Sequence, residues 1–473
     1  MCVACSPGIA ALARGVLGNL AAPSFVPAAI GASAGARAAA ERAVILRGGP
    51  ILTVDEACPV AEALAIRGSR ILAVGSATDV KRHFTATTEI LDLEGRAVLP
   101  GFVEPHVSVL GSALAADGGA DAAGDRLAEE PECVAELCAA TLREFAARGC
   151  TTVYDTGIGR LGGLAEHELL RTLARAQVAP VRVRGALVPE LASALGAAPG
   201  AGDDRYDVAG IAYWVDGAMA DRAAALRDPY LGGGDAGALN YTDEELREAL
   251  RGWQRAGWQL VVHAHGDRAN EQVLRCFEAV LADAPPGRTP HRIEHFTLAS
   301  DEQAAHAAAL GLSVSHAINE IYFRGEQWRD EVLGAERAAR IHSLLRDVEH
   351  EICSSCHSGS QWERPGDCTP IGGGAVDPLL AIRTAMTRLM RDSDDVLGPF
   401  QQLDLGQALR MVTRNPARQV LLGDRVGVLR AGMLADLVVL DRDPREVAPE
   451  RLHELRVLET WLGGRRQRWS DLR

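Results

Sequence analysis

The sequence predicts an α/β protein in which a (β/α)8 barrel of the TIM type is joined to a small β-sandwich built from both ends of the chain. Strand-like runs and amphipathic helical stretches alternate over residues 100–420, which is the order that a barrel of parallel strands requires. Short runs rich in branched residues and punctuated by glycine occupy 41–99 and return in 421–473. We therefore expect a barrel over 100–420 and one composite β domain from the two flanking segments.

The barrel requires eight strands, and the sequence offers eight candidates. They are residues 102–110, 150–157, 180–188, 210–218, 258–266, 291–296, 312–318 and 350–359. Helical stretches separate most of them, and one of these opens with Thr242 followed three residues later by Glu245, the pattern of a capping box.

Composition limits the possible partners. The net charge of −14 argues against a nucleic acid or an anionic membrane surface as the partner. No apolar run reaches the length of about 18 residues that a membrane span needs. The ten cysteines lack the spacing of a disulfide scaffold. We expect a cytoplasmic protein that binds a small molecule. The sequence leaves open whether the chain forms a homo-oligomer.

Residues 1–40 differ from the rest of the chain. They are rich in alanine, glycine and proline, and Arg14 and Arg37 are their only charged residues. We expect a weakly ordered leader. Residues 32–34, Ala-Ser-Ala after an apolar stretch, resemble a secretory cleavage site, but a basic start is missing and Arg14 interrupts the apolar part. Export therefore stays the alternative to a cytoplasmic location.

Histidines stand at the ends of three predicted strands. His106 belongs to the first, His263 and His265 to the fifth, and His295 to the sixth. Residues at the carboxyl ends of barrel strands carry the chemistry of this fold, and neutral imidazole suits Zn²⁺. We predict that three or four of these imidazoles form a metal site. His265 shares a strand face with His263 and is an extra ligand or a substrate contact.

Five motifs occur in an order that resembles the amidohydrolase superfamily, and most of all its branch known as amidohydrolase 3. They are LPGFVEPHV, IAYWVDGA, VVHAHGDRAN, RIEHF and GVLRAGMLADLVVLDRDP, and the resemblance covers residues 43–470. It implies a barrel with a β-sandwich, and hydrolysis of C–N bonds in amides, ureas or cyclic amides with one or two divalent metals.

Three of the six metal-site positions that the resemblance implies hold other residues. The second histidine of the His-x-His motif is Ser108, the strand-4 lysine is Ala212, and the strand-8 aspartate is Gly359. Lys81 is the only lysine of the chain and lies in the predicted β domain, so no other lysine can replace it. The resemblance therefore implies a reduced site for one metal at His106, His263 and His295, with zinc favoured and either weakly bound or absent.

Other residues are candidates for supporting roles. His357 at the end of strand 8 is an extra ligand or a substrate contact, and Asp367 is a weak surrogate for the missing aspartate, which leaves the catalytic residue unassigned. Asp216 and Asp267 either accept hydrogen bonds from ligand histidines or brace loops and helix starts.

The cysteines around His357 allow three interpretations. Cys353 and Cys356 followed by His357 match a c-type haem attachment pattern, for which the sequence supplies no supporting context. With Cys368, the same residues offer thiolate and imidazole ligands for a metal. We favour buried structural cysteines.

Two functions follow from these residues. The first is a metal-dependent hydrolase of non-peptide C–N bonds, in which the metal activates water and polarises the scissile carbonyl. The alternative is a catalytically inactive protein with an amidohydrolase fold, a pseudo-enzyme that retains a binding or assembly role, because three ligand positions are lost together.

Overall fold

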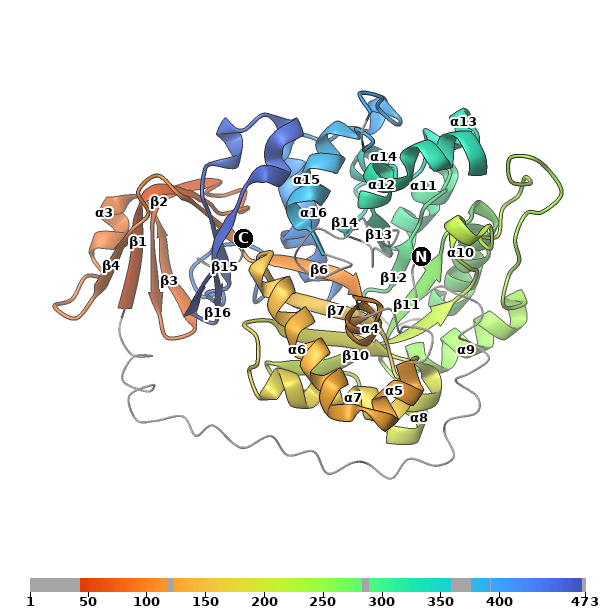
Figure 1. Cartoon of the computed structure of the whole chain (residues 1–473), viewed down its shortest axis with the longest axis horizontal. Coiled ribbons are helices and arrows are strands. Elements are labelled where there is room, and N and C mark those ends of the chain that lie inside the picture. Colours follow the sequence, from red (N-terminus) through yellow and green to blue (C-terminus); the bar gives the residue numbers. More distant parts are fainter. Residues whose placement is uncertain (1–42, 117–122, 283–288, 359–375, 392, 470–473) are drawn as a thin grey trace.

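A computed structural model describes residues 43–116, 123–282, 289–358, 376–391 and 393–469 (Figure 1). The leader expected over residues 1–40 lies outside the described residues, and so do Gly359, Asp367 and Cys368. Within the described part of the chain, none of the helices is long and apolar enough to cross a membrane.

The central sheet is a nearly closed barrel of eight parallel strands that follow one another in chain order. They are β6 (Phe102–Val107), β7 (Cys150–Ile158), β8 (Arg182–Leu187), β10 (Tyr206–Trp214), β11 (Gln259–Ala264), β12 (Arg292–His295), β13 (Ser313–Ala317) and β14 (Ser354–His357). The short β9 (Ala201–Gly202) adds to β10 in antiparallel orientation. Each strand overlaps one predicted from the sequence, so the predicted barrel is confirmed.

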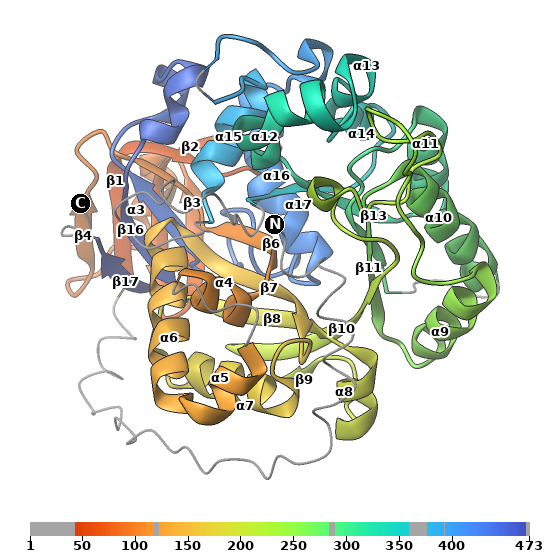
Figure 2. The same cartoon turned by 45° about the vertical axis from the view of Figure 1, so that its right-hand side comes forward.

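Helices surround the strands, as Figure 2 shows. They are α4 (Val109–Ala116), α5 (Ala123–Glu129), α6 (Pro131–Ala147), α7 (Gly163–Arg175), α8 (Pro189–Leu195), α9 (Asp243–Arg255), α10 (Asp267–Leu281), α11 (Asp301–Ala309), α12 (Asn319–Gln327), α13 (Ala335–Ala338), α14 (Leu344–Glu349), α15 (Pro378–Thr387), α16 (Leu405–Val412) and α17 (Arg414–Gln419). At the start of α9 the hydroxyl of Thr242 accepts from Glu245 N, and the Glu245 carboxylate accepts from Thr242 N, which confirms the predicted capping box.

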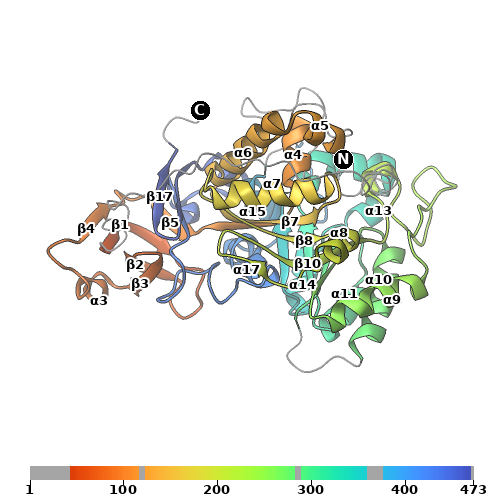
Figure 3. The ribbon, with the colours of Figure 1, turned by 90° about the horizontal axis from the view of Figure 1, so that it is seen from below.

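A second sheet lies beside the barrel and combines both ends of the described chain (Figures 1 and 3). Its strands are β1 (Ala43–Leu52), β2 (Val60–Arg67), β3 (Arg70–Gly75), β4 (Glu89–Asp92), β5 (Ala97–Pro100), β15 (Leu437–Leu440), β16 (Val457–Leu462) and β17 (Arg465–Arg468), and α3 (Ala77–Lys81) follows β3. The antiparallel pairing of β5 with β15 joins the two halves. Ile51, Leu64, Leu437 and Trp461 from these strands share one buried hydrophobic cluster, as the predicted composite β domain requires.

The first and last strands of the barrel, β6 and β14, are the two ends of its strand order and lie next to each other. The carboxyl group of Glu104 in β6 accepts hydrogen bonds from the backbone N of Ser358 at 3.0 Å and from its hydroxyl at 2.9 Å. Ser358 follows β14 directly, and its hydroxyl also accepts from Asp377 N at 2.8 Å. Side-chain bonds of Glu104 therefore tie the two strands together at the barrel seam.

This seam predicts a pH dependence of stability. Burial raises the pKa of the Glu104 carboxyl to about 8, although the bonds from Ser358 oppose the shift. The folded state therefore holds a proton that the unfolded chain, with a glutamate pKa of about 4.3, releases earlier. The stabilisation of the folded state by this proton is fully present below a pH of about 4.3. It is lost as the pH rises towards 8.

We expect the free energy of unfolding to fall as the pH rises over this interval, and to fall less steeply in the variant Glu104→Gln. Urea titrations at several pH values, with chelator present to remove metal effects, measure both slopes. The exposed Glu278→Gln serves as the matched control. Equal slopes for the wild type and Glu104→Gln would contradict the assignment.

Candidate metal centre

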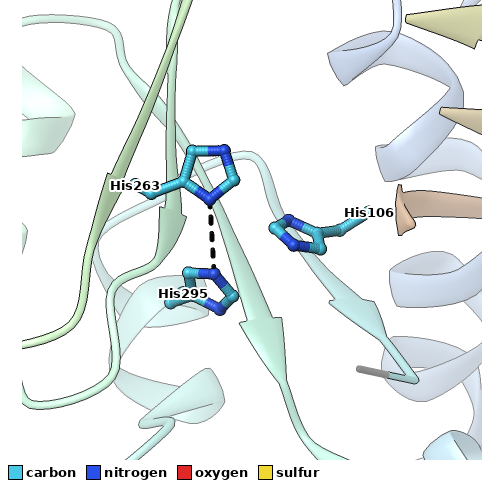
Figure 4. A group of neighbouring side chains, drawn as sticks. All are labelled: His106, His263 and His295. Atoms are coloured by element: carbon cyan, nitrogen blue, oxygen red, sulfur yellow. Dashed lines mark hydrogen bonds between the residues drawn. The ribbon is translucent and has the colours of Figure 1, made fainter. Parts of the chain in front are cut away.

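Three histidines meet at the carboxyl-terminal end of the barrel strands (Figure 4). His106 lies in β6, His263 in β11 and His295 at the end of β12. One ring nitrogen of each lies within 4.8 Å of the others, and the three side chains are buried. The structure thus brings together the three ligands predicted from the sequence.

The spacing of two of these nitrogens suits a metal ion. His263 Nδ1 and His295 Nε2 are 3.4 Å apart, which is long for a hydrogen bond between ring nitrogens. Zinc binds imidazole nitrogen at about 2.0–2.1 Å in tetrahedral geometry, so two such ligands are separated by about 3.4 Å. The donor set and its spacing therefore fit a divalent ion such as zinc.

A buried carboxylate orients His106. Glu294 Oε2 lies 2.8 Å from His106 Nδ1, and the hydroxyl of Ser315 donates to the same oxygen at 2.6 Å. Arg292 Nε donates to the other oxygen of Glu294. With its Nδ1–H donated to the carboxylate, His106 keeps Nε2 as the nitrogen without a proton, the form that binds a metal ion, which is the arrangement common in metal-bound histidines.

Electrostatics keep Glu294 ionised. Burial alone would raise the pKa of its carboxyl, but the Arg292 guanidinium and His106 outweigh that effect and hold the pKa well below its usual value. Arg292 also donates to the carbonyl of Pro105 at 2.9 Å and lies over the ring of Tyr154. This ion pair therefore contacts the metal-site histidines through the bond between Glu294 and His106.

Two more histidines line the group. The ring of His265 stacks on His295 with centroids 3.9 Å apart, and its Nδ1 lies 3.2 Å from Thr297 Oγ1. The ring of His357 stacks on His106 at 4.4 Å. Neither belongs to the set of three described residues whose nitrogens converge, so both are placed as neighbours of the ligands.

The two aspartates proposed from the sequence brace loops. Asp216 accepts backbone N–H bonds from Ala225, His265 and Gly266 at 2.9–3.0 Å. Asp267 begins α10 and accepts from Arg227 N at 2.8 Å. These bonds correspond to the bracing alternative and run to backbone groups, so neither carboxylate contacts the ring of a ligand histidine through them.

Two of the three positions that depart from the ligands implied by the resemblance have structural roles. The hydroxyl of Ser108 accepts from Gly111 N at 3.2 Å, at the start of α4. Ala212 is buried in a hydrophobic cluster inside the barrel with Tyr154 and Val261. Serine at a helix start and alanine in this cluster each fit their surroundings without a metal.

The cysteines of the strand-8 segment show no metal grouping among the described residues. The thiol of Cys353 donates to the carbonyl of Asn415 at 3.7 Å, and Cys356 is buried, which raises the pKa of its thiol. Buried thiols with high pKa values are inert, as the structural interpretation predicts.

Sequence reasoning missed three residues at this site, namely Glu294, Trp214 and Arg160. The ring of Trp214 stacks on His263 with centroids 4.7 Å apart, and the guanidinium of Arg160 lies 4.2 Å from the Trp214 ring centre. Glu294 stands directly before a predicted ligand, and this adjacency was the only signal for it.

Comparisons with known proteins agree with this architecture. A family model described as "Amidohydrolase family" matches residues 110–467. N-substituted formamide deformylase of Arthrobacter pascens is 29% identical over 231 residues, which cover 48% of this chain and 40% of that protein. Putative amidohydrolase YtcJ of Bacillus subtilis is 27% identical over 260 residues, which cover 53% and 45%. The matches thus span less than half the length of these relatives.

Solved structures share the fold. An uncharacterized metal-dependent hydrolase from Pyrococcus furiosus superposes with a TM-score of 0.71 at 20% identity, covering 86% of this chain and 100% of that one. Molinate hydrolase superposes with a TM-score of 0.61 at 15% identity, covering 90% and 95%. At these identities the likeness establishes the fold alone.

Proposed function

Because the chain belongs to the amidohydrolase family, we propose that it is a metal-dependent hydrolase of non-peptide C–N bonds in a small amide, urea or cyclic amide. The observation that carries the proposal is the group of three buried imidazoles at the catalytic end of the barrel. The name of the Arthrobacter relative, a deformylase of N-substituted formamides, supports the same bond type.

One divalent ion, zinc by preference, is proposed at His106, His263 and His295. A bound ion of this kind lowers the pKa of a water ligand and polarises the carbonyl of the substrate. Three imidazoles leave one tetrahedral position open, as in catalytic zinc sites. A second ion is not proposed, because Ser108 and Ala212 serve the helix start and the barrel core.

The chain's own residues prepare this site. Glu294 holds the proton of His106 on Nδ1 and so leaves Nε2 as the nitrogen that would bind the metal ion. The indole of Trp214 covers one side of His263 and excludes water from it. His265 and His357 fill the space beside His295 and His106 with polarisable rings that a substrate would contact.

The alternative is a barrel that binds a ligand without turnover. It is favoured by Ser108 and Ala212, which stand where the resemblance implies metal ligands. Ser108 instead accepts a hydrogen bond at a helix start, and Ala212 packs in a hydrophobic cluster. The metal site would then be a remnant or a structural element.

Metal analysis and activity separate the two functions. At neutral pH the hydrolase should contain about one zinc per chain, lose thermal stability with chelator and release amine from N-substituted formamides, ureas or cyclic amides. A metal-free protein whose thermal midpoint is the same with and without chelator would overturn the metal proposal. Metal without turnover, together with amidase activity gained by the combined variant Ser108→His, Ala212→Lys and Gly359→Asp, would favour the inactive alternative.

A further inference from the structure

Arg160, Trp214 and His263 form three stacked layers at the barrel mouth. The guanidinium carbon of Arg160 lies 4.2 Å from the Trp214 ring centre. The indole in turn lies 4.7 Å from the His263 ring, at an interplanar angle of 23°. Trp214 ends β10 and Arg160 follows β7 by two residues, so both occupy the rim where the metal-site histidines lie. A cation is thus held two layers away from a candidate metal ligand.

The loop that carries Arg160 is firmly held. A single carboxylate oxygen of the buried Glu166 accepts N–H bonds from Gly159, Leu161 and Gly162 at 3.0, 3.1 and 2.9 Å. These three bonds surround Arg160 on both sides along the backbone. Rigid support of this kind is what a binding residue needs to meet its ligand in one geometry.

The indole has room to lie flat because its neighbour is a glycine. A Cβ atom at Gly157 would come within 3.1 Å of two ring carbons of Trp214. The absence of a side chain there lets the indole lie between Arg160 and His263. The stack is therefore specified by the backbone of one strand end and the side chain of another.

Trp214 also carries an unsatisfied donor. Its Nε1 is buried and has no hydrogen-bond partner among the described residues. A buried N–H without an acceptor is costly, and such groups commonly await a water or a ligand. The residue that separates the cation from the metal site thus offers a hydrogen bond to an incoming acceptor.

We propose that Arg160 and the indole N–H of Trp214 bind a carboxylate of the substrate, so that the hydrolysed compound is an amide bearing an acidic group. A guanidinium has five N–H donors at its edge, and it can bind a carboxylate bidentately while its face rests on the indole. In a chain of net charge −14, attraction of an acidic substrate requires such a local cation.

The layering also sets the position of the acidic group. The carboxylate would lie beside Arg160, two stacking distances from His263, and the scissile carbonyl at the histidines. An extended chain advances about 1.2 Å per bond, so a substrate that spans this interval has about six bonds between its carboxylate and its scissile carbonyl. The substrate class rests on the proposed hydrolase function, whereas binding of the carboxylate does not.

Binding of compounds that cannot be hydrolysed tests the inference. We would use 7-oxooctanoate, which has a ketone in place of the amide six bonds from its carboxylate, and its neutral counterpart 8-hydroxyoctan-2-one, with the purified full-length protein in calorimetric titrations. The wild type should bind the acid about 10- to 100-fold more tightly than the neutral compound, as a charge-assisted bidentate contact predicts. Arg160→Gln should remove this preference and leave binding of the neutral compound unchanged.

Further variants separate recognition from packing. Trp214→Phe retains an aromatic face but lacks the N–H, so it should weaken binding of the acid by a smaller factor, about 2- to 10-fold. Arg160→Lys should keep part of the preference because it keeps the charge. The exposed Arg222→Gln, whose guanidinium donates to the carbonyl of Glu331, is the matched control and should bind like the wild type.

Two results would overturn the inference: equal affinity of the wild type for both compounds, or a preference for the acid that survives Arg160→Gln. If Arg160 only supported the indole, Arg160→Gln would lower the affinity for both compounds by the same factor. Since neither compound is turned over, absence of hydrolysis in a separate assay counts against the hydrolase proposal alone.

Discussion

Replacing His263 with alanine is expected to reduce the bound metal from about one ion per chain to near zero, since a three-histidine site that loses one ligand keeps only two. The ring of His263 is buried, and its Nδ1 has the spacing from His295 expected of a shared ion. Elemental analysis of the purified variant measures the loss. Hydrolysis, where the wild type shows it, should disappear with the metal.

Thermal stability gives a second measure of the same change. A ligand present at about 1,000 times its Kd stabilises the folded state by about 4 kcal/mol, so added zinc should raise the midpoint of the wild type and not that of His263→Ala. The partly exposed His306, paired with Glu278 on the barrel surface, supplies the control variant His306→Ala. Full metal content in His263→Ala would show that the ion binds elsewhere.

Replacing Glu294 with alanine is expected to lower the free energy of unfolding by about 3–5 kcal/mol, the usual cost of leaving one partner of a buried ion pair unpaired. Arg292 and Glu294 are both fully buried, so water cannot compensate the charge that remains. Urea denaturation in the presence of chelator isolates this effect from metal binding. The same variant should also bind zinc more weakly, because His106 loses its acceptor.

An exposed ion pair provides the comparison for this variant. Glu271 pairs with Arg227 and Arg275 on the surface, and Glu271→Ala should cost at most about 1 kcal/mol. The double variant Arg292→Leu with Glu294→Leu should recover part of the stability, since it removes both charges. A loss below about 1 kcal/mol in Glu294→Ala would contradict the role assigned to the pair.

The barrel and its three histidines could be predicted because both depend on local patterns. Strand-like runs such as 258–266 have the right length and composition, and the rule that chemistry lies at strand ends, together with the family resemblance, selected His106, His263 and His295. The structure places all three together. Periodicity and motif order were sufficient for this part of the site.

Glu294 could not be predicted from the alternation of side chains along a strand, although the adjacent His295 was predicted as a ligand. Adjacent residues of a strand point to opposite faces, so a ligand at His295 predicts a glutamate directed away from the site. His295 has a φ of 73°, however, and the backbone leaves the regular strand conformation at this residue. Both side chains can therefore serve the same site, which no alternation pattern shows.

The stack of Arg160 on Trp214 could not be predicted for a different reason. The two residues belong to strand ends more than 50 positions apart in the sequence, and their contact depends on the loop held by Glu166 and on the space beside Gly157. Ser108 is similar, because its bond to Gly111 N exists only where α4 begins. These features arise from tertiary packing, for which a single sequence holds no periodic signal.

The pairing of β5 with β15 governs the order in which the molecule can assemble during synthesis. Leu99 pairs with Val438, so one edge of β5 has no partner until the entire barrel segment has been translated. At about 5–20 residues per second, the roughly 340 residues between them take about 20–70 s to emerge from the ribosome. An open strand edge invites association with other chains during that time. The nascent protein is therefore most vulnerable to aggregation just before its last strands appear, and a chaperone that shields β5 would protect it.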